Sequence, residues 1–426
     1  MNTPRTLESP IPTPTLDTAV VARRLPRTFA ALQHRNYLLF FLGMLVSTAG
    51  TWMQIVAQGW IVYQISGSEW TLGLVAFASA IPALIVSPWG GVLVDRVSKR
   101  NILIVTQASS MILAFVLAAL VLTNVVEVWH VIVLAALTGL VNAIDAPARQ
   151  ALTPDLIQNR SELPNAIALN AMVFNSARVI GPAFGGILLV TVGAGWCFFF
   201  NGVSFIAVII SLLMMKLPAM ERVINPQSPF AQLKSGASYI RQDKRILGIM
   251  VLSTALCLFG VSFTTVLPAY VDKVLLASES AYANLTAAQG VGAVFGAIIL
   301  ATYGNEVRRG WIVTAATIYF PIALFALAFT PNYWIAMGLM FILGIGFISQ
   351  FNQLNVLLQL HVDNAMRGRV MSLYTLTFFG VSPFGNLLIG YWSESWGITP
   401  AIAVSAAIAL GCAIVIHYFV PEIRKM

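Results

Sequence analysis

Twelve long apolar segments follow one another along the chain, separated by short polar gaps. Each is long enough for a helix to cross the roughly 30 Å hydrocarbon core of a bilayer, which takes about 20 residues. The pattern therefore predicts twelve membrane-spanning helices. We place them at residues 37–64, 71–94, 101–123, 128–148, 163–193, 195–217, 245–271, 282–304, 311–330, 334–360, 368–392 and 398–420.

The positive charges predict the orientation of these spans. Of the 24 Lys and Arg residues, all but Lys273 and Arg178 lie at the termini or in every second gap between spans. Cytoplasmic loops of membrane proteins carry an excess of Lys and Arg. We therefore predict a multi-pass protein of the cell (inner) membrane with both termini in the cytoplasm. Tryptophans, which favour membrane interfaces, gather at the opposite ends of the spans: Trp70, Trp129, Trp196, Trp334, Trp392 and Trp396.

The composition excludes several other classes of protein. With 58% apolar and 9% charged residues, the chain is unlike a soluble domain. Its three cysteines all lie in apolar segments without ligand spacing, so neither a disulfide framework nor a metal site is indicated. The histidines stand alone, which disfavours an enzyme. We expect no cofactor and no nucleic-acid partner, and the net charge of +8 suits anionic membrane lipids.

The chain divides into two similar halves. Residues 1–35 are polar and rich in proline, which predicts a disordered cytoplasmic tail, and residues 422–426 form a cytoplasmic C-terminus. Residues 218–244 predict a cytoplasmic linker with an amphipathic helix on the membrane surface. Between them lie two six-span halves, 36–217 and 245–421, each with a proline in its fifth span, Pro182 and Pro383. Two six-span repeats are a transporter architecture with the substrate near the midplane.

Residues 90–100 (GGVLVDRVSKR), between spans two and three, resemble the signature loop of the major facilitator superfamily. Residues 36–40, 50–54, 145–150 and 163–166 resemble the branch of enterobactin-type siderophore exporters and macrolide-efflux proteins. The resemblance implies an all-α membrane fold of twelve helices in two six-helix bundles related by pseudo-two-fold symmetry. It also implies export of amphiphilic small molecules, usually driven by the proton gradient.

The signature loop implies a cytoplasmic gate. In the family, the counterpart of Asp95 meets the positive end of a helix in the other half, here the span starting near Gly368, and a nearby arginine. The paired glycines let helices approach closely. A plain solvated turn that sets topology is the alternative interpretation. The candidate gate residues are Gly90, Gly91, Asp95, Arg96, Lys99, Arg100 and Arg149.

Span five carries a second motif, which resembles the core of the motif found in proton-coupled antiporters of the superfamily. A proline bends a helix and small residues allow tight packing, so the segment would act as an occluding kink. Ala177 stands where the family motif has a glycine, so the match is partial. A packing kink without a coupling role remains an alternative. The candidate residues are Gly181, Pro182, Gly185 and Gly186.

Asp145 and Arg178 are the ionisable residues placed well within spans. Arg178 lies about 22 Å along span five at 1.5 Å per residue, close to the membrane midplane. Asp145 is positioned to pair with Arg149 at i+4, or with Arg178 if spans four and five face each other. We assign Asp145 and Arg178 to proton coupling, and a permanent ion pair is the alternative. Span four lacks the mid-membrane arginine that many antiporters of the superfamily carry.

Span one carries no acidic residue and offers amide and aromatic side chains instead. We therefore take amides and aromatic residues as the candidate substrate contacts. Asn352, Asn355 and Gln359 fall on one helical face. Together with the charged Arg178, these side chains suit a large polar amphiphile that is either anionic or neutral, such as a catecholate or an acylated peptide. Hydrogen bonds between helices would explain the same residues. The candidates are Gln54, Gln58, Tyr63, Arg178, Gln350, Asn352, Asn355 and Gln359.

Together these patterns predict a monomeric secondary active transporter that exports an amphiphilic small molecule, a siderophore or a drug, by alternating access and proton antiport. The chain has no Gly-Lys-Ser or Gly-Lys-Thr phosphate-binding loop, which disfavours a built-in ATP motor. Two alternatives remain open. One is an importer or facilitator of a siderophore-like solute, and the other is a lipid-handling or receptor-like membrane protein.

Overall fold

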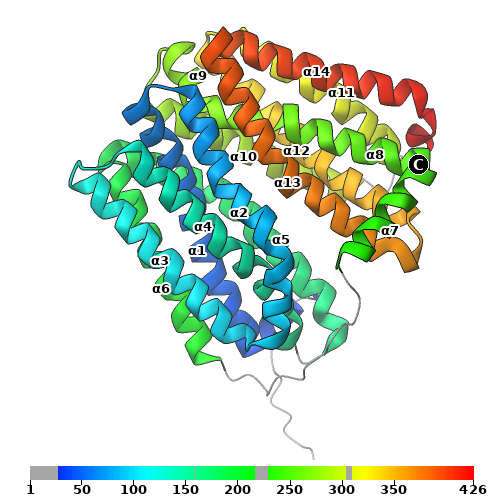
Figure 1. Cartoon of the computed structure of the whole chain (residues 1–426), viewed down its shortest axis with the longest axis horizontal. Coiled ribbons are helices and arrows are strands. Elements are labelled where there is room, and N and C mark those ends of the chain that lie inside the picture. Colours follow the sequence, from blue (N-terminus) through cyan, green and yellow to red (C-terminus); the bar gives the residue numbers. More distant parts are fainter. Residues whose placement is uncertain (1–26, 158, 216–228, 304–308) are drawn as a thin grey trace, which may run out of the picture.

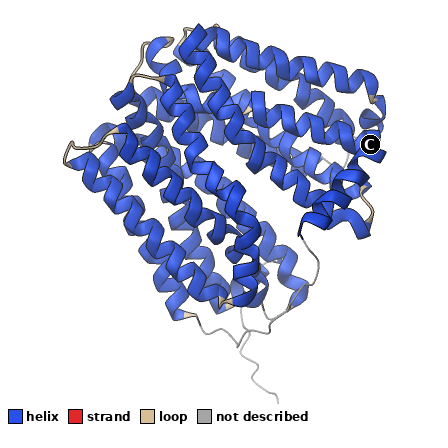
Figure 2. Ribbon diagram, viewed as in Figure 1, coloured by secondary structure: helices blue, strands red, loops and turns tan. Residues whose placement is uncertain are grey.

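The computed structural model describes residues 27–157, 159–215, 229–303 and 309–426, which are helical without β-strands (Figure 1, Figure 2). Twelve of its helical segments are long and apolar enough to cross a membrane. This confirms the all-α, twelve-span prediction.

Each span of the first half is one helix. The six helices are α1 (Arg35–Ser66), α2 (Glu69–Arg96), α3 (Lys99–Leu122), α4 (Val128–Leu152), α5 (Leu163–Thr191) and α6 (Ala194–Met214).

The second half begins with the linker helix α7 (Pro229–Gln242), in the segment where we predicted an amphipathic helix. Its seventh span consists of α8 (Lys244–Ala255), a π-helical turn (Leu256–Gly260), a 3-10 turn (Ser262–Val266) and α9 (Leu267–Lys273). The remaining spans are α10 (Glu279–Tyr303), α11 (Arg309–Ala328), α12 (Tyr333–His361), α13 (Asn364–Trp396) and α14 (Ile398–Phe419).

The halves pack as two related bundles. Across the boundary between them, α2 packs against α13, and α5 packs against α10. The first pair joins span two to span eleven, and the second joins span eight to span five. Spans two and five of the first half correspond to spans eight and eleven of the second half. A two-fold rotation that exchanges the halves therefore places one pair on the other. The pseudo-two-fold arrangement follows from this exchange. In Figure 1 the bundles converge near the start of α2 and the end of α9, and they diverge toward α7.

The same turn precedes the last helix of each half. Gly193 before α6 and Gly397 before α14 have φ values of 89° and 91°, a backbone region that side-chain-bearing residues rarely adopt. A glycine is therefore required where the chain turns from the proline-containing span into the final span of each bundle.

The break in the seventh span was not predicted. Pro268 has no N–H and cannot continue the hydrogen-bond ladder of the preceding turn. Earlier in the same span, the Ser262 hydroxyl donates to the carbonyl of Leu258 at 2.8 Å. Because the helix axis is interrupted, α9 forms a separate short segment that ends at the boundary between the bundles.

The N-terminal tail is ordered from a point earlier than we predicted. Residues Arg27–Gln33 form a 3-10 helix. The backbone N–H of Ala31 donates to Oδ1 of Asn165 at 3.0 Å, and His34 lies 2.8 Å from Glu162. The residues just before α1 are thus fixed against the start of α5.

Candidate functional site

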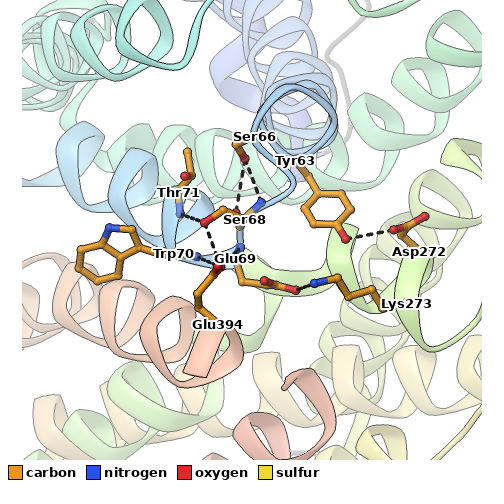
Figure 3. A network of polar contacts seen from close by, with 9 residues as sticks. All are labelled: Tyr63, Ser66, Ser68, Glu69, Trp70, Thr71, Asp272, Lys273 and Glu394. Atoms are coloured by element: carbon orange, nitrogen blue, oxygen red, sulfur yellow. Dashed lines mark hydrogen bonds and ion pairs between the residues drawn. The ribbon is translucent and has the colours of Figure 1, made fainter. Parts of the chain in front are cut away.

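Polar side chains join the two bundles at the end where they converge. Figure 3 shows that these residues come from the end of α1, the turn after it and the start of α2, and from the ends of α9 and α13. The ammonium of Lys273 lies 2.6 Å from Oε1 of Glu69, and the hydroxyl of Tyr63 donates to Oδ2 of Asp272 at 3.0 Å. We call Tyr63, Ser68, Glu69, Trp70, Asp272, Lys273 and Glu394 the bundle-bridging network.

Glu394 of α13 supplies an anion to the start of α2. Its Oε2 accepts from the hydroxyl of Ser68 at 2.9 Å, from the N–H of Glu69 at 2.9 Å and from the N–H of Trp70 at 3.3 Å. The first N–H groups of a helix have no partner within that helix, and its N-terminus carries partial positive charge. A carboxylate from the second bundle therefore caps the N-terminus of a helix in the first bundle.

The Glu69 carboxylate depends on Lys273. Glu69 is 2% exposed, whereas the Lys273 side chain is 49% exposed. A buried carboxylate is costly unless it is paired. In the sequence, Lys273 is visible only as an exception to the charge pattern. Glu69, Asp272 and Glu394 lie in gaps of the same parity, which predicts a shared side of the membrane but not contact between these residues.

Close packing continues from the network toward the middle of the molecule. The rings of Trp60 and Tyr282 stack across the boundary with centroids 5.9 Å apart. A Cβ added at Gly390 would lie 2.7 Å from the carbonyl oxygen of Glu69, and one added at Gly73 would lie 2.7 Å from that of Asn386. Only glycine fits α2 and α13 at this separation.

Arg178 lies between the bundles at the middle of α5. The central carbon of its guanidinium is 4.3 Å from the ring centroid of Phe347 on α12 and 5.5 Å from that of Trp52 on α1. Gly290 of α10 packs against the Arg178 carbonyl. Within the described part of the chain, Arg178 has no ion pair and no side-chain hydrogen bond.

Asp145 is bound within the first bundle. Its Oδ1 accepts from the hydroxyl of Thr106 at 2.7 Å and from the amide of Gln107 at 2.8 Å, and its Oδ2 pairs with Arg149. Of the two pairings considered from the sequence, the structure has the one with Arg149. Asp145 and Arg178 are not brought together, because α4 packs against α2 and α3 while α5 packs against α1 and α10.

The glycines of the candidate occluding kink face two different neighbours. Gly181 and Gly185 pack against Trp52 and Met53 of α1, in the same bundle. Gly186 packs against Ala283 of α10, in the other bundle. Pro182 lies inside α5, which continues through it.

The candidate amides do not form one site. Gln54 accepts from Asn201 of α6 at 2.6 Å within the first bundle, and Gln58 is half-buried. Gln359 donates to Asn355 at 2.6 Å, one turn away on the same helix, and Asn352 is exposed.

Gln350 instead faces the interior of the second bundle, where it lines a small cavity with Thr317 and Phe320. Its side-chain oxygen is buried and has no hydrogen-bond partner among the described residues. The amide is therefore directed away from the boundary between the bundles.

The candidate cytoplasmic gate is only partly described. Gly90, Gly91, Asp95 and Arg96 belong to α2, but their surroundings lie outside what the structure describes. Lys99 pairs with Asp155 at 2.6 Å, and Arg100 donates to the carbonyls of Leu212 and Leu213 at 2.6 and 2.8 Å. These contacts stay within the first bundle. A Cβ added at Gly368 would meet no described atom within 4 Å.

Comparison with known proteins identifies this arrangement. The sequence profile of a protein family described as transmembrane secretion effector matches residues 26–426. The chain belongs to this family of the major facilitator superfamily. It is therefore a membrane transporter and not an enzyme.

Curated relatives align over nearly the whole chain. The staphyloferrin A transporter of Staphylococcus aureus is 25% identical over 91% of this chain and 96% of its own length. The multidrug efflux pump Tap of Mycobacterium tuberculosis is 24% identical, with 91% and 94% covered. The enterobactin exporter EntS of Escherichia coli is 25% identical, with 88% of each chain covered. Siderophore transport and drug efflux are both represented among these relatives.

Solved structures share the fold at low sequence identity. The nucleoside transporter NupG has a TM-score of 0.70 at 13% identity, covering 90% of this chain and 98% of that one. A bacterial homologue of the human lysosomal transporter Spinster has a TM-score of 0.65 at 15% identity, covering 94% and 96%. These similarities support the two-bundle architecture and do not bear on the substrate.

Proposed function

We propose that this protein exports an amphiphilic small molecule, a siderophore or a drug, from the cytoplasm by alternating access coupled to proton antiport. The observation that carries the proposal is the bundle-bridging network, in which five polar contacts join the two halves at one end. The named activities of the relatives supply the substrate classes.

The distribution of positive charge supports the assignment of sides. If both termini lie on the cytoplasmic face of the inner membrane, the turn between α1 and α2 lies outside. The bundle-bridging network then closes the outer end, and the end where the ribbons diverge faces the cytoplasm. In this inward-facing state a substrate enters from the cytoplasm, and opening of the network releases it outside. Both sides of the boundary come from one chain, so a monomer is sufficient.

For proton coupling we retain Asp145 and Arg178 as separate elements. A proton on Asp145 would remove the charge that holds Arg149, which itself contacts Met44 of α1. Protonation would thereby alter packing among α1, α3 and α4. Arg178 lies between the bundles, where substrate and conformational change act together.

Transport in inside-out membrane vesicles tests the proposal. Enterobactin, erythromycin and N-dansyl-leucine serve as probes, and the expected result is uptake of at least one probe under an imposed proton gradient. An uncoupler is expected to abolish that uptake, and uptake that persists with an uncoupler contradicts antiport. Accumulation only in right-side-out vesicles would favour an importer, and no uptake of any probe would favour a lipid-handling role.

A further inference from the structure

Arg178 is a cation without a counter-ion in the described part of the chain. A guanidinium carries five N–H donors, and no described side chain or carbonyl accepts from them. Asp145, the carboxylate considered as its partner, already binds Thr106, Gln107 and Arg149. Charged groups at membrane depth are costly and are normally paired. An acceptor is therefore missing.

The contacts that Arg178 does make leave its donors free. The Phe347 and Trp52 rings lie against the guanidinium carbon at 4.3 and 5.5 Å, in cation–π contact. The N–H groups of a guanidinium point outward in its plane, and their fork matches a carboxylate or another planar oxyanion. Two aromatic rings beside that fork suit an apolar group attached to the anion.

The depth of this cluster matches a substrate site. Trp52, Arg178 and Phe347 lie at or next to the midpoints of α1, α5 and α12, each of which spans the apolar layer. Trp52 and Arg178 belong to the first bundle, and Phe347 belongs to the second. Substrate sites of two-bundle transporters lie near the midplane between the repeats.

We propose that Arg178 binds an oxyanion of the transported molecule, and that the substrate class is an amphiphile with an apolar body and at least one carboxylate or similar planar anionic group. The inference rests on the proposed export function and specifies its substrate. The anion supplies the missing counter-ion, and Trp52 and Phe347 contact the apolar body beside it. A neutral analogue leaves the guanidinium unpaired, and a cationic analogue meets a like charge.

Movement of the bundles then acts on the same contact. Separation of α12 from α5 removes Phe347 from the guanidinium and admits water. Water competes for the N–H donors, so the affinity for the anion falls when the substrate has to leave.

A matched pair of ligands tests the inference by fluorescence titration of the purified full chain. N-dansyl-leucine carries one carboxylate, and its primary amide is nearly the same size but neutral. N-dansyl-11-aminoundecanoic acid and its amide form a second, longer pair. We expect each acid to bind about tenfold or more tightly than its amide, as is usual for a desolvated charge pair.

The variants separate charge from shape. Arg178→Gln is expected to remove the preference for the acids, and Arg178→Lys to keep part of it, because an ammonium retains the charge and lacks the fork. Arg245→Gln is the matched control, since Arg245 is exposed and pairs with Asp243 outside the bundle boundary. It should leave the acid-to-amide ratio unchanged. Monodisperse elution and an unchanged melting temperature establish that each variant is folded.

Three results overturn the inference: neither acid binds, acid and amide bind equally, or Arg178→Gln keeps the wild-type ratio. Transport in inside-out vesicles distinguishes this failure from failure of the proposed function. If wild type and Arg178→Gln both take up the acid and the amide equally, the anion site is refuted and the export function is supported. Arg178-dependent binding of the acids, without uptake of either acid or of enterobactin or erythromycin, removes export and leaves the anion site standing.

Discussion

Glu69 and Lys273 show how one residue pair connects two halves of a transporter. The carboxylate is buried in the first bundle and its cation comes from α9 in the second, so the charge of Glu69 is balanced only while the halves touch. When the network opens, water has to replace Lys273. The pair therefore stabilises the state in which this end is closed relative to the state in which it is open.

Lys273→Ala is expected to shift the protein toward opening at this end, by about 1–3 kcal/mol, because it leaves the buried Glu69 without its half-exposed cation. The neutral double variant Glu69→Gln/Lys273→Gln should recover part of the closed population, since no unpaired charge remains. Spin labels at the exposed positions Val125 and Leu276, in a background without the three native cysteines, report the separation by pulsed electron paramagnetic resonance. An unchanged distance distribution in Lys273→Ala would show that the pair does not hold the bundles together.

Asp145→Asn tests proton coupling separately from folding. The amide oxygen can still accept from Thr106 or Gln107, so the protein should remain folded. We expect gradient-driven uptake to fall at least about tenfold while exchange of substrate across the vesicle membrane without a gradient persists, because an amide cannot take up and release a proton as a carboxylate does. Wild-type gradient-driven uptake would mean that Asp145 is only a structural tie, which joins α4 to Thr106 and Gln107 of α3.

Among the helices, α2 and α13 share more than a packing surface. Glu394 of α13 caps the N-terminus of α2, so separation of the bundles at this end would remove an acceptor from the first turn of α2. Helix caps are worth about 1 kcal/mol. The stability of this turn is thus coupled to the conformational state.

Glu394→Ala is expected to raise hydrogen exchange at the amides of Glu69 and Trp70, measured by mass spectrometry. Asn332→Ala is the matched control, because Asn332 caps Trp334 and Ile335 of α12 within one half. It should raise exchange at its own helix without increasing the distance between the spin labels. If Glu394→Ala leaves exchange in α2 unchanged, the cross-bundle cap does not contribute.

The glycines of α5 give a second prediction about helices. Gly186→Leu places a side chain against Ala283 of the other bundle, so we expect a folded protein that cannot close its outer end and has lost transport. Gly181→Leu places the same side chain against α1 within one bundle, where overpacking costs about 1–3 kcal/mol and should lower the melting temperature. If Gly186→Leu lowered the melting temperature as much as Gly181→Leu, the assignment of Gly186 to packing between the bundles and of Gly181 to packing within one bundle would be contradicted.

Across the whole protein, the features that depend on local pattern could be predicted from the sequence. The spans follow from apolar length, the linker helix from its amphipathic pattern, and the pairing of Asp145 with Arg149 from i+4 spacing. The bundle-bridging network could not be predicted, because Lys273, Glu69 and Glu394 are far apart in the chain and meet only once the bundles have a relative position. The i+4 spacing of the amides on α12 also agrees with the structure, where Gln359 donates to Asn355, and their role in substrate binding stays a prediction.

The central claim is that the bundle-bridging network opens and closes during export. Ser68→Cys/Glu394→Cys, in a background without native cysteines, places one thiol on each bundle within the network, and a short bifunctional thiosulfonate can join them. The measurement is proton-driven uptake of enterobactin, erythromycin and N-dansyl-leucine into inside-out vesicles before cross-linking, after it and after reduction. We predict uptake of at least one probe, its loss on cross-linking and its return on reduction. Uptake that continues with the network cross-linked would contradict the account.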